Sequence, residues 1–216
     1  MTRNTNPMNT HLTHALPRTI VVRSRADGSS RAFRMDRLGP RDRGAMLALQ
    51  EVACGPLMHP LTPDEVDGML GEGGCVLGGF LADRLAAFLA IQFPGRGAHN
   101  LGRDYGLPEE DLDRAVHLTG VLVHPDLRGN GLHRALVETA AGSLLSPRRH
   151  RYWFATVRPE NVPSVRGMQS VGMRVFACHP KHDGHDRFLF VRDLWEGTPP
   201  ACAAPAPGRV PESTPA

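Results

Sequence analysis

The feature that most constrains this chain is an apolar run that leads through two glycines into an amphipathic helix. The run covers residues 116–123, and Gly129 and Gly131 lie in the short segment after it. The run is almost wholly apolar, which is typical of a central strand covered on both faces. Residues 129–146 then show small or apolar side chains at helical spacing, namely Leu132, Ala135, Leu136, Thr139, Ala140, Ser143 and Leu144. The segment therefore predicts a buried strand, a tight loop and a helix in direct succession.

The loop with its two glycines is suited to binding a phosphate or pyrophosphate. Glycine lets the backbone approach a ligand closely and adopt conformations closed to other residues. The first turn of the helix presents unpaired N–H groups and the positive end of the helix dipole. A nucleotide-triphosphate loop would need Gly-Lys-Ser/Thr, and a dinucleotide fingerprint would need a third glycine; neither is present. The pattern alone leaves two alternatives, another kind of phosphate loop or an ordinary strand-to-helix turn.

Two linked motifs resemble those of the GCN5-related N-acetyltransferases (GNAT). That family carries Arg/Gln-x-x-Gly-x-Gly/Ala between a central strand and the helix that binds the pyrophosphate of coenzyme A (CoA). Residues 128–133, Arg-Gly-Asn-Gly-Leu-His, match at the first five positions, and His133 replaces the final Gly or Ala. Further on, Asn161 and Gly172-Met173 are similar to a second unit of the family, in which an Asn opens a helix that ends in Gly-Phe or Gly-Met.

The resemblance implies a mixed α/β fold with a mostly antiparallel sheet, flanked by helices, whose central parallel strands splay apart. It implies that acetyl-CoA is the co-substrate and that its pantetheine arm enters the gap between these strands. It also implies an N-acetyltransferase that acts by direct attack of an amine on the thioester within a ternary complex. The implied cofactor-binding residues are Val121, Leu122, Val123, Arg128, Gly129, Asn130, Gly131, Leu132, His133 and Asn161.

The rest of the pattern fits this order of elements. Residues 1–17 are expected to form a loose N-terminal tail, residues 18–196 the acyltransferase domain, and residues 197–216 a disordered Pro/Ala-rich tail. A long loop is expected over residues 94–114. The other strands are expected at 20–25, 32–38, 75–81, 85–93, 152–157, 173–179 and 187–194, and the other helices at 41–54, 62–71 and 161–172.

The catalytic residues are less well indicated than the cofactor site. Many relatives place a Tyr four residues before the glycine that ends the last helix, as the acid for the leaving thiolate, and this chain has Met168 there. Ser164, Ser170, Tyr152 or a water molecule are the alternatives for that role. His117, at the start of the central strand, is the candidate base because the pKa of histidine lies near neutral pH. The alternative is a structural histidine with a hydrogen-bonded ring.

The acceptor is expected to be the amine of a small molecule or a peptide. Residues 94–114 contain five acids. If these acids form a rim around the acceptor site, they would favour a cationic amine. The alternative is a solvent-exposed run of charge that has no role in binding the acceptor. Two other functions stay open, a transferase of a different acyl group and a CoA-binding regulatory module without catalysis. The acids are Asp104, Glu109, Glu110, Asp111 and Asp113.

Composition and charge exclude several other classes of protein. The net charge of +3 and the single tight basic cluster at residues 147–151 argue against specific nucleic-acid binding. No apolar stretch is long enough to span a membrane, and the N-terminus has no apolar signal core. The four cysteines lie far apart, so a reduced, cytoplasmic setting is expected.

Two further expectations concern metals and assembly. His179, His182 and His185 would have to converge in a hairpin turn to bind a metal, and we expect ordinary turn histidines and no metal. A homodimer is an assembly that the resemblance allows.

Overall fold

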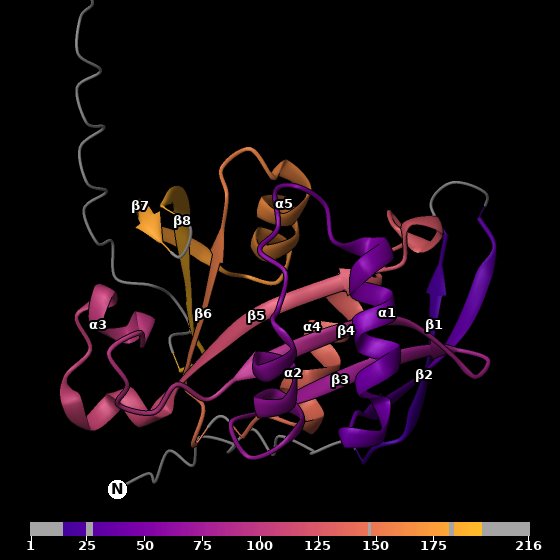
Figure 1. Ribbon diagram of the computed structural model, residues 1–216, viewed down its shortest axis with the longest axis horizontal. Coiled ribbons are helices and arrows are strands. Elements are labelled where there is room, and N and C mark those ends of the chain that lie inside the picture. The colour runs from indigo at the N-terminus through magenta and orange to yellow at the C-terminus, as the bar shows by residue number, and fades with distance from the viewer. Residues whose placement is uncertain (1–14, 25–27, 147, 182–183, 196–216) are drawn as a thin grey trace, which may run out of the picture.

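The computed structural model describes residues 15–24, 28–146, 148–181 and 184–195. Within them the strands form one eight-stranded sheet in the order β1-β2-β3-β4-β5-β6-β8-β7 (Figure 1). Neighbouring strands run antiparallel except β5 and β6, which are parallel, so the predicted fold class is confirmed. The strands are β1 (Arg18–Arg23), β2 (Ser30–Arg37), β3 (Gly74–Leu81), β4 (Arg84–Gln92), β5 (Ala115–Val123), β6 (Tyr152–Val157), β7 (Arg174–Lys181) and β8 (His185–Asp193).

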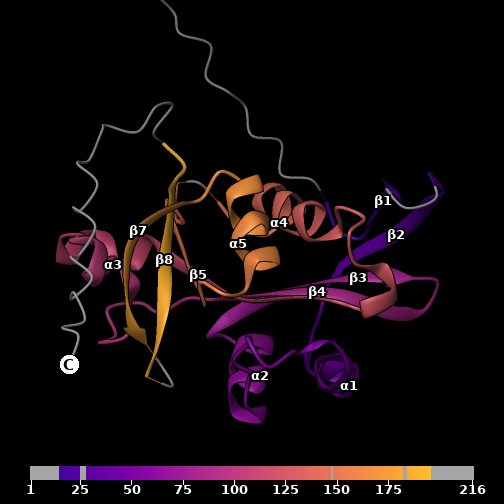
Figure 2. The ribbon, with the colours of Figure 1, turned by 90° about the horizontal axis from the view of Figure 1, so that it is seen from above.

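Helices cover the sheet on both faces. The α-helices are α1 (Arg43–Ala53), α2 (Pro63–Leu70), α3 (Leu101–Tyr105), α4 (Leu132–Ser143) and α5 (Val162–Ser170). The 3-10 helices are η1 (Pro40–Asp42), η2 (Glu109–Arg114) and η3 (Pro125–Leu127). Figure 2 shows α4 and α5 on one face, α1 and α2 on the other, and α3 beside the β7–β8 end of the sheet.

Each face of the sheet has its own apolar core. On one face, Leu136 of α4 and Met168 of α5 pack with Leu89 of β4 and Trp153 of β6. On the other, α1 and α2 pack against Phe88 and neighbouring strand residues. Burial on both faces explains why the central strands are almost wholly apolar, as residues 116–123 predicted.

The two central strands separate soon after they meet. In the described structure β5 and β6 pair only at Ala115–Tyr152, Val116–Trp153 and His117–Phe154. On its other side β5 stays paired with β4 as far as Val123, with an irregular register at Thr119. The edge of β5 that faces β6 is therefore left without a strand partner beyond His117, among the strands described.

The expected loop over residues 94–114 is wrong, because the segment contains α3 and η2. Asn100 begins α3 by accepting a hydrogen bond from the N–H of Gly102, and Gly106, with φ +85°, ends it. A helix this short shows no apolar periodicity, so the sequence pattern does not predict it. The predicted helix over 129–146 begins later, at Leu132, because Gly129 and Gly131 adopt left-handed conformations.

The tails predicted at 1–17 and 197–216 fall mostly outside the described residues. Of the first, Leu16 is described and packs against the core on the α4 and α5 face. None of the helices in the described ranges combines the length and the apolar composition that a membrane crossing requires.

Candidate functional site

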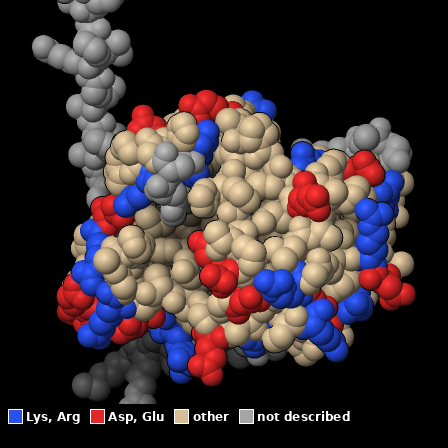
Figure 3. Space-filling view, in the orientation of Figure 1, with Lys and Arg blue, Asp and Glu red and all other residues tan. Residues whose placement is uncertain are grey.

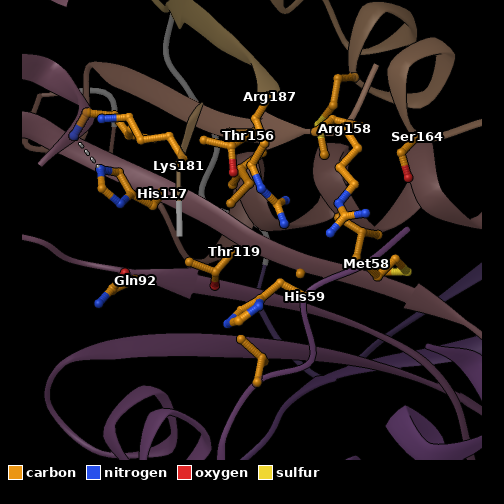
Figure 4. A pocket seen from close by; sticks show the side chains of 18 of the residues that line it. Met58, His59, Gln92, His117, Thr119, Thr156, Arg158, Ser164, Lys181 and Arg187 are labelled. Atoms are coloured by element: carbon orange, nitrogen blue, oxygen red, sulfur yellow. Dashed lines mark hydrogen bonds between the residues drawn. The ribbon is translucent and has the colours of Figure 1, made fainter. Parts of the chain in front are cut away.

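A cavity of about 480 Å³ lies at the gap between β5 and β6. Strand residues from Leu118 to Val121 and from Ala155 to Arg158 line it. Residues from both sides of the sheet complete the wall: His133, Asn161, Ser164 and Met168 come from α4 and α5, and Met58, His59 and Glu65 come from the α1–α2 side. Figure 4 shows side chains from both sides pointing into this space. The cavity therefore connects the two faces of the sheet.

The loop before α4 has the backbone geometry of an anion site. Gly129 and Gly131 both have φ near +77°, a conformation that other residues rarely adopt. A Cβ built on either glycine would have no neighbour within 4 Å, so space is open beside the loop. Gly131 is the N-cap of α4 and carries no side chain that could bond the first N–H groups of the helix. These N–H groups and the helix dipole are available to a pyrophosphate.

The structure places the predicted cofactor residues in three settings. Val121, His133 and Asn161 line the cavity, and Gly129, Asn130 and Gly131 form the open loop. Leu122 and Leu132 are buried in the apolar cores, and Val123 packs against one of them. Arg128 donates through Nε to the carbonyl of Val123, at 3.2 Å, and through its terminal N–H to the carbonyl of Ala53, at 2.6 Å. Arg128 thus joins the loop to the end of α1.

His133 lies in the first turn of α4, against Gly167 of α5. A Cβ added to Gly167 would meet the imidazole at 3.0 Å. Both ring nitrogens of His133 are shielded from solvent and have no hydrogen-bond partner among the described residues. Burial lowers the pKa of His133 to about 4, so the ring is neutral at pH 7.

His117 lines the cavity, and its ring is fixed by the backbone of α3. Its Nε2 accepts a hydrogen bond from the N–H of Leu101 at 3.1 Å, and the side chain is buried (Figure 4). A neutral imidazole that accepts through Nε2 carries its proton on Nδ1. The ring can therefore take a second proton only if it releases the amide of Leu101. Beside it, the hydroxyl of Thr119 donates to the carbonyl of Ala90 at 3.2 Å.

The two candidate serines have different positions. Ser164 lies in the cavity wall, one turn into α5, and its backbone N–H donates to Asn161. Ser170 is exposed on the same helix, donates to the carbonyl of Gly167 at 2.7 Å and does not belong to the cavity wall. Tyr152 donates instead to Asp111, and burial raises the pKa of its hydroxyl. Of the side chains considered for the acid, the structure brings Ser164 to the site.

Two arginines in the cavity were missed by sequence analysis. Arg158 follows β6 and Arg187 lies in β8, and Figure 4 shows both side chains pointing into the cavity near Thr119 and His59. Arg187 is only 4% exposed. Strand alternation places Phe154 and Thr156 on one side of β6, and Arg158 follows directly after the strand. Whether that side faces a cavity depends on how β6 pairs with β5 and β8, which the local sequence does not reveal.

Four of the five acids between residues 94 and 114 pair with basic side chains. Asp113 pairs with Arg96 at 2.8 Å, Asp111 with Arg114 at 3.1 Å, and Glu109 with Arg103. Asp104, on α3, accepts two hydrogen bonds from Lys181 of β7, at 2.8 and 3.0 Å. Figure 3 looks onto this side of the molecule and shows it hollowed, with blue and red side chains interspersed around the hollow.

Within the described ranges, no three His, Cys, Asp or Glu side chains gather as metal ligands. His182, one of the three histidines considered for a metal, lies outside those ranges.

Comparison with known proteins identifies the family of this chain. Residues 55–173 match the family described as "Acetyltransferase (GNAT) family". No curated protein matches the chain in sequence. In structure the chain is similar to the ribosomal-protein-S18-alanine N-acetyltransferase from Escherichia coli, with a TM-score of 0.56 and 19% identity over 75% of this chain and 94% of that one.

Two similar structures contain the expected co-substrate. NAA60 of Arabidopsis thaliana, in complex with acetyl-CoA, has a TM-score of 0.61 and 13% identity over 75% of this chain and 98% of that one. The structure of yncA from Salmonella typhimurium with its cofactor acetyl-CoA has a TM-score of 0.54 and 19% identity over 79% and 99%. At these identities the similarity establishes the fold, while the family match covers more than half of the chain.

Proposed function

Because the chain belongs to the GNAT acetyltransferase family, we propose that it transfers an acetyl group from acetyl-CoA to a primary amine of a small molecule or peptide. The observation that carries the proposal is the cavity between β5 and β6, whose wall includes His133, in the first turn of the helix that follows Gly129 and Gly131. Acetyl-CoA supplies the activated acyl group as a thioester. The amine attacks the carbonyl carbon directly, a C–N bond forms, the C–S bond breaks, and the amine proton is released.

The residues present fit CoA. The open backbone at Gly129, Asn130 and Gly131 and the first turn of α4 would hold the pyrophosphate. The unpaired edge of β5, at Gly120 and Val121, offers backbone groups to the amide-rich pantetheine arm, as a neighbouring strand would. The backbone N–H groups of this edge can also polarise the thioester carbonyl.

His117 and Ser164 are the proposed proton-transfer groups. His117 can act as the base for the attacking amine if it releases the amide of Leu101. Ser164 faces the cavity and can donate a hydrogen bond toward the leaving sulfur. Met168 lines the cavity without a proton to donate, so the thiolate depends on Ser164 or on water.

The test is acetyl-CoA turnover with a panel of amines, followed by release of free thiol. Substitution of Asn130 by Asp places a carboxylate in the phosphate loop and is expected to weaken CoA binding about tenfold or more, which corresponds to about 1.4 kcal/mol. Asn130→Ala is the matched control and should retain most of the affinity.

Two outcomes would contradict the proposal. Equal CoA affinity of the Asn130→Asp and Asn130→Ala variants would show that the loop does not bind the pyrophosphate of CoA. Tight CoA binding without thiol release above the uncatalysed rate, for any amine, would make the chain a non-catalytic CoA-binding module. Propionyl-CoA, run in parallel with acetyl-CoA, tests transfer of a different acyl group.

A further inference from the structure

We propose that Arg128 is a positioning residue that couples the phosphate loop to the segment between α1 and α2, residues 54–62. CoA bound at the loop thereby fixes one wall of the cavity that receives the acceptor. The inference rests on the proposed function and names a residue that serves both substrates through the backbone. It follows from three observations: the contacts of Arg128, the anchoring of the segment, and the side chains that the segment contributes to the cavity wall.

Arg128 lies directly before Gly129 and forms hydrogen bonds with two carbonyls that are distant from each other in sequence. Its Nε donates to the carbonyl of Val123 at 3.2 Å, and its terminal N–H donates to the carbonyl of Ala53 at 2.6 Å. Val123 is the last residue of β5, and Ala53 is the last residue of α1. A guanidinium presents its N–H donors in a rigid planar fork, so one side chain holds both elements in a fixed relation.

The end of α1 is a favourable place for a cation. The last carbonyls of a helix have no partner within the helix and carry a partial negative charge. Ala53 is 2% exposed, so water has little access to its carbonyl. The next residue, Cys54, already has an extended backbone. Arg128 therefore binds α1 at the point where the helix ends and the segment begins.

The far end of the segment is anchored by a side chain of α1. The amide of Gln50 donates to the carbonyl of Leu61 at 2.8 Å and accepts from the N–H of Leu61 at 2.9 Å. Between the two anchors, the N–H of Met58 donates to the carbonyl of Gly55 at 2.9 Å, and the two prolines of the segment have no N–H to donate. A segment with few backbone hydrogen bonds opens more easily than a helix or a strand, so its anchors determine its conformation.

The segment forms part of the cavity wall. Leu57, Met58 and Leu61 line the cavity. Figure 2 shows α1 and α2 on the face of the sheet opposite α4, whose first turn follows the phosphate loop. The acceptor enters from the face of α1 and α2, because CoA occupies the other face. A change at Ala53 therefore reaches apolar side chains that face the acceptor.

The phosphate loop can transmit the binding of CoA to this wall. Pyrophosphate held by the N–H groups of the loop restricts the backbone at Gly129 and Gly131, whose φ angles are near +77°. A restricted loop restricts the adjacent Arg128 and, through it, Ala53. A second ligand then meets a site that is already ordered and loses less conformational entropy on binding. CoA is thus expected to bind first and to strengthen the binding of the acceptor.

Hydrogen exchange of the full chain, measured with and without CoA, tests the coupling in the absence of an acceptor. In the wild type, saturating CoA should slow the exchange of the amides between residues 55 and 61 by about tenfold, because fixed anchors make local opening rarer. In Arg128→Gln the same amides should exchange faster and respond to CoA by about twofold or less. Exchange at residues 129–133 should slow in both proteins, which shows that each is folded and has bound CoA.

Two further variants separate this role from a direct contact between Arg128 and the pyrophosphate. Arg128→Lys keeps the charge but cannot reproduce the fork, so its segment should behave as in Arg128→Gln. Arg134→Gln removes a charge from the first turn of α4, where Arg134 pairs with Glu138, and its segment should respond to CoA as in the wild type. Arg128→Lys also provides the comparison if Arg128→Gln does not fold.

Turnover gives a second measurement of the coupling. With an amine that the wild type acetylates, Arg128→Gln should raise the KM for the amine about fivefold or more, a typical strength of coupling between two sites. The Kd of CoA, measured by calorimetry, should stay within about threefold of the wild type. A general loss of folded structure would weaken both substrates alike and would not produce this difference.

The outcomes separate this inference from the proposed function. Exchange between residues 55 and 61 that is unaffected by CoA in the wild type, or that responds equally in Arg128→Gln, would overturn the inference. A Kd of CoA that is lost in Arg128→Gln and retained in Arg128→Lys would make Arg128 a direct contact of the pyrophosphate and would also overturn it. Absence of CoA binding to the wild type would overturn the proposed function itself.

Discussion

His133 occupies the place of a Gly or Ala in the family motif, and Gly167 of α5 leaves room for it. The imidazole lies where a Cβ on Gly167 would approach to 3.0 Å. The pair shows a large residue on one helix matched by the smallest residue on the next. A sequence motif compared position by position shows only the departure at His133, because the compensating residue is distant in sequence.

Gly167→Ala tests this packing. In a helix interior, Gly to Ala normally stabilises by about 1 kcal/mol. Here the new methyl group would meet the His133 ring, so we expect the gain to be lost or reversed in the wild type and recovered in a His133→Ala background. Urea unfolding of the four proteins of this cycle gives the coupling energy. A coupling of zero would show that the two residues do not restrict each other.

His133 also makes stability depend on pH. The folded pKa is about 4, while the ring titrates near 6.5 in the unfolded chain. Between these values the unfolded chain binds a proton that the folded chain does not, so stability falls as the pH decreases through this window. The loss reaches at most about 3 kcal/mol. In the His133→Gln variant, the urea concentration at the unfolding midpoint should change less between pH 7 and pH 5 than it does in the wild type. The same pH dependence in both proteins would contradict this.

At the scale of elements, the segment between β4 and β5 supports the cavity wall at His117. Asn100 is 1% exposed; its amide donates to the carbonyls of Gly95 and Leu112, and its oxygen accepts from Gly102. These bonds hold α3 against the sheet. The neighbouring amide of Leu101 then reaches His117. One buried side chain thus organises the wall around the candidate base.

Asn100→Ala should remove this organisation. Loss of three buried hydrogen bonds is expected to lower the free energy of unfolding by about 2–4 kcal/mol, since the partners lose their bonds in a buried site. It should also weaken acceptor binding more than CoA binding, because α3 lies on the acceptor side. Glu110→Ala, an exposed change in the same segment, serves as the control and should stay within about 0.5 kcal/mol of wild type. Similar stability of both variants would show that Asn100 does not support the segment.

At the scale of the whole molecule, we propose that the sheet separates a cofactor side from an acceptor side. The phosphate loop lies with α4 and α5, whereas Arg158 and Arg187 lie on the side of α3, and the β5–β6 gap connects them. Cofactor and acceptor can therefore occupy the protein together. No cysteine lies among the described cavity residues, and burial raises the pKa of Cys75, on β3, to about 11. The protein offers no thiolate there to carry the acetyl group.

This arrangement predicts sequential kinetics. Initial rates measured against both substrates should give intersecting double-reciprocal lines, because both must be bound before chemistry occurs. Incubation with acetyl-CoA alone should leave the protein mass unchanged. Parallel lines or a stable acetylated protein would instead indicate a covalent intermediate.

The cofactor side could be predicted from the sequence because its parts are neighbours along the chain. A buried strand, a loop with Gly129 and Gly131 and a helix follow one another directly, and strand, turn and helix preferences act over this range. The same holds for Asn161 at the start of α5. These local preferences were sufficient to predict a mixed α/β sheet and the succession of strand, loop and helix in which we place the phosphate loop.

The side of the sheet on which we propose that the acceptor binds depends on tertiary structure. Arg158 and Arg187 line the same cavity because β8 pairs with β6. Lys181 forms an ion pair with Asp104, which is 77 residues away in sequence. The buried hydrogen bonds of Asn100 stabilise α3. The sequence shows no apolar periodicity that would predict this helix. The charge that a side chain presents to a ligand depends on whether a partner of opposite charge compensates it. Partners that are distant in sequence are brought together only by the register of the sheet. The sequence by itself therefore determined the strand, loop and helix around Gly129 and Gly131, and only the folded sheet decided which charged side chains line the cavity.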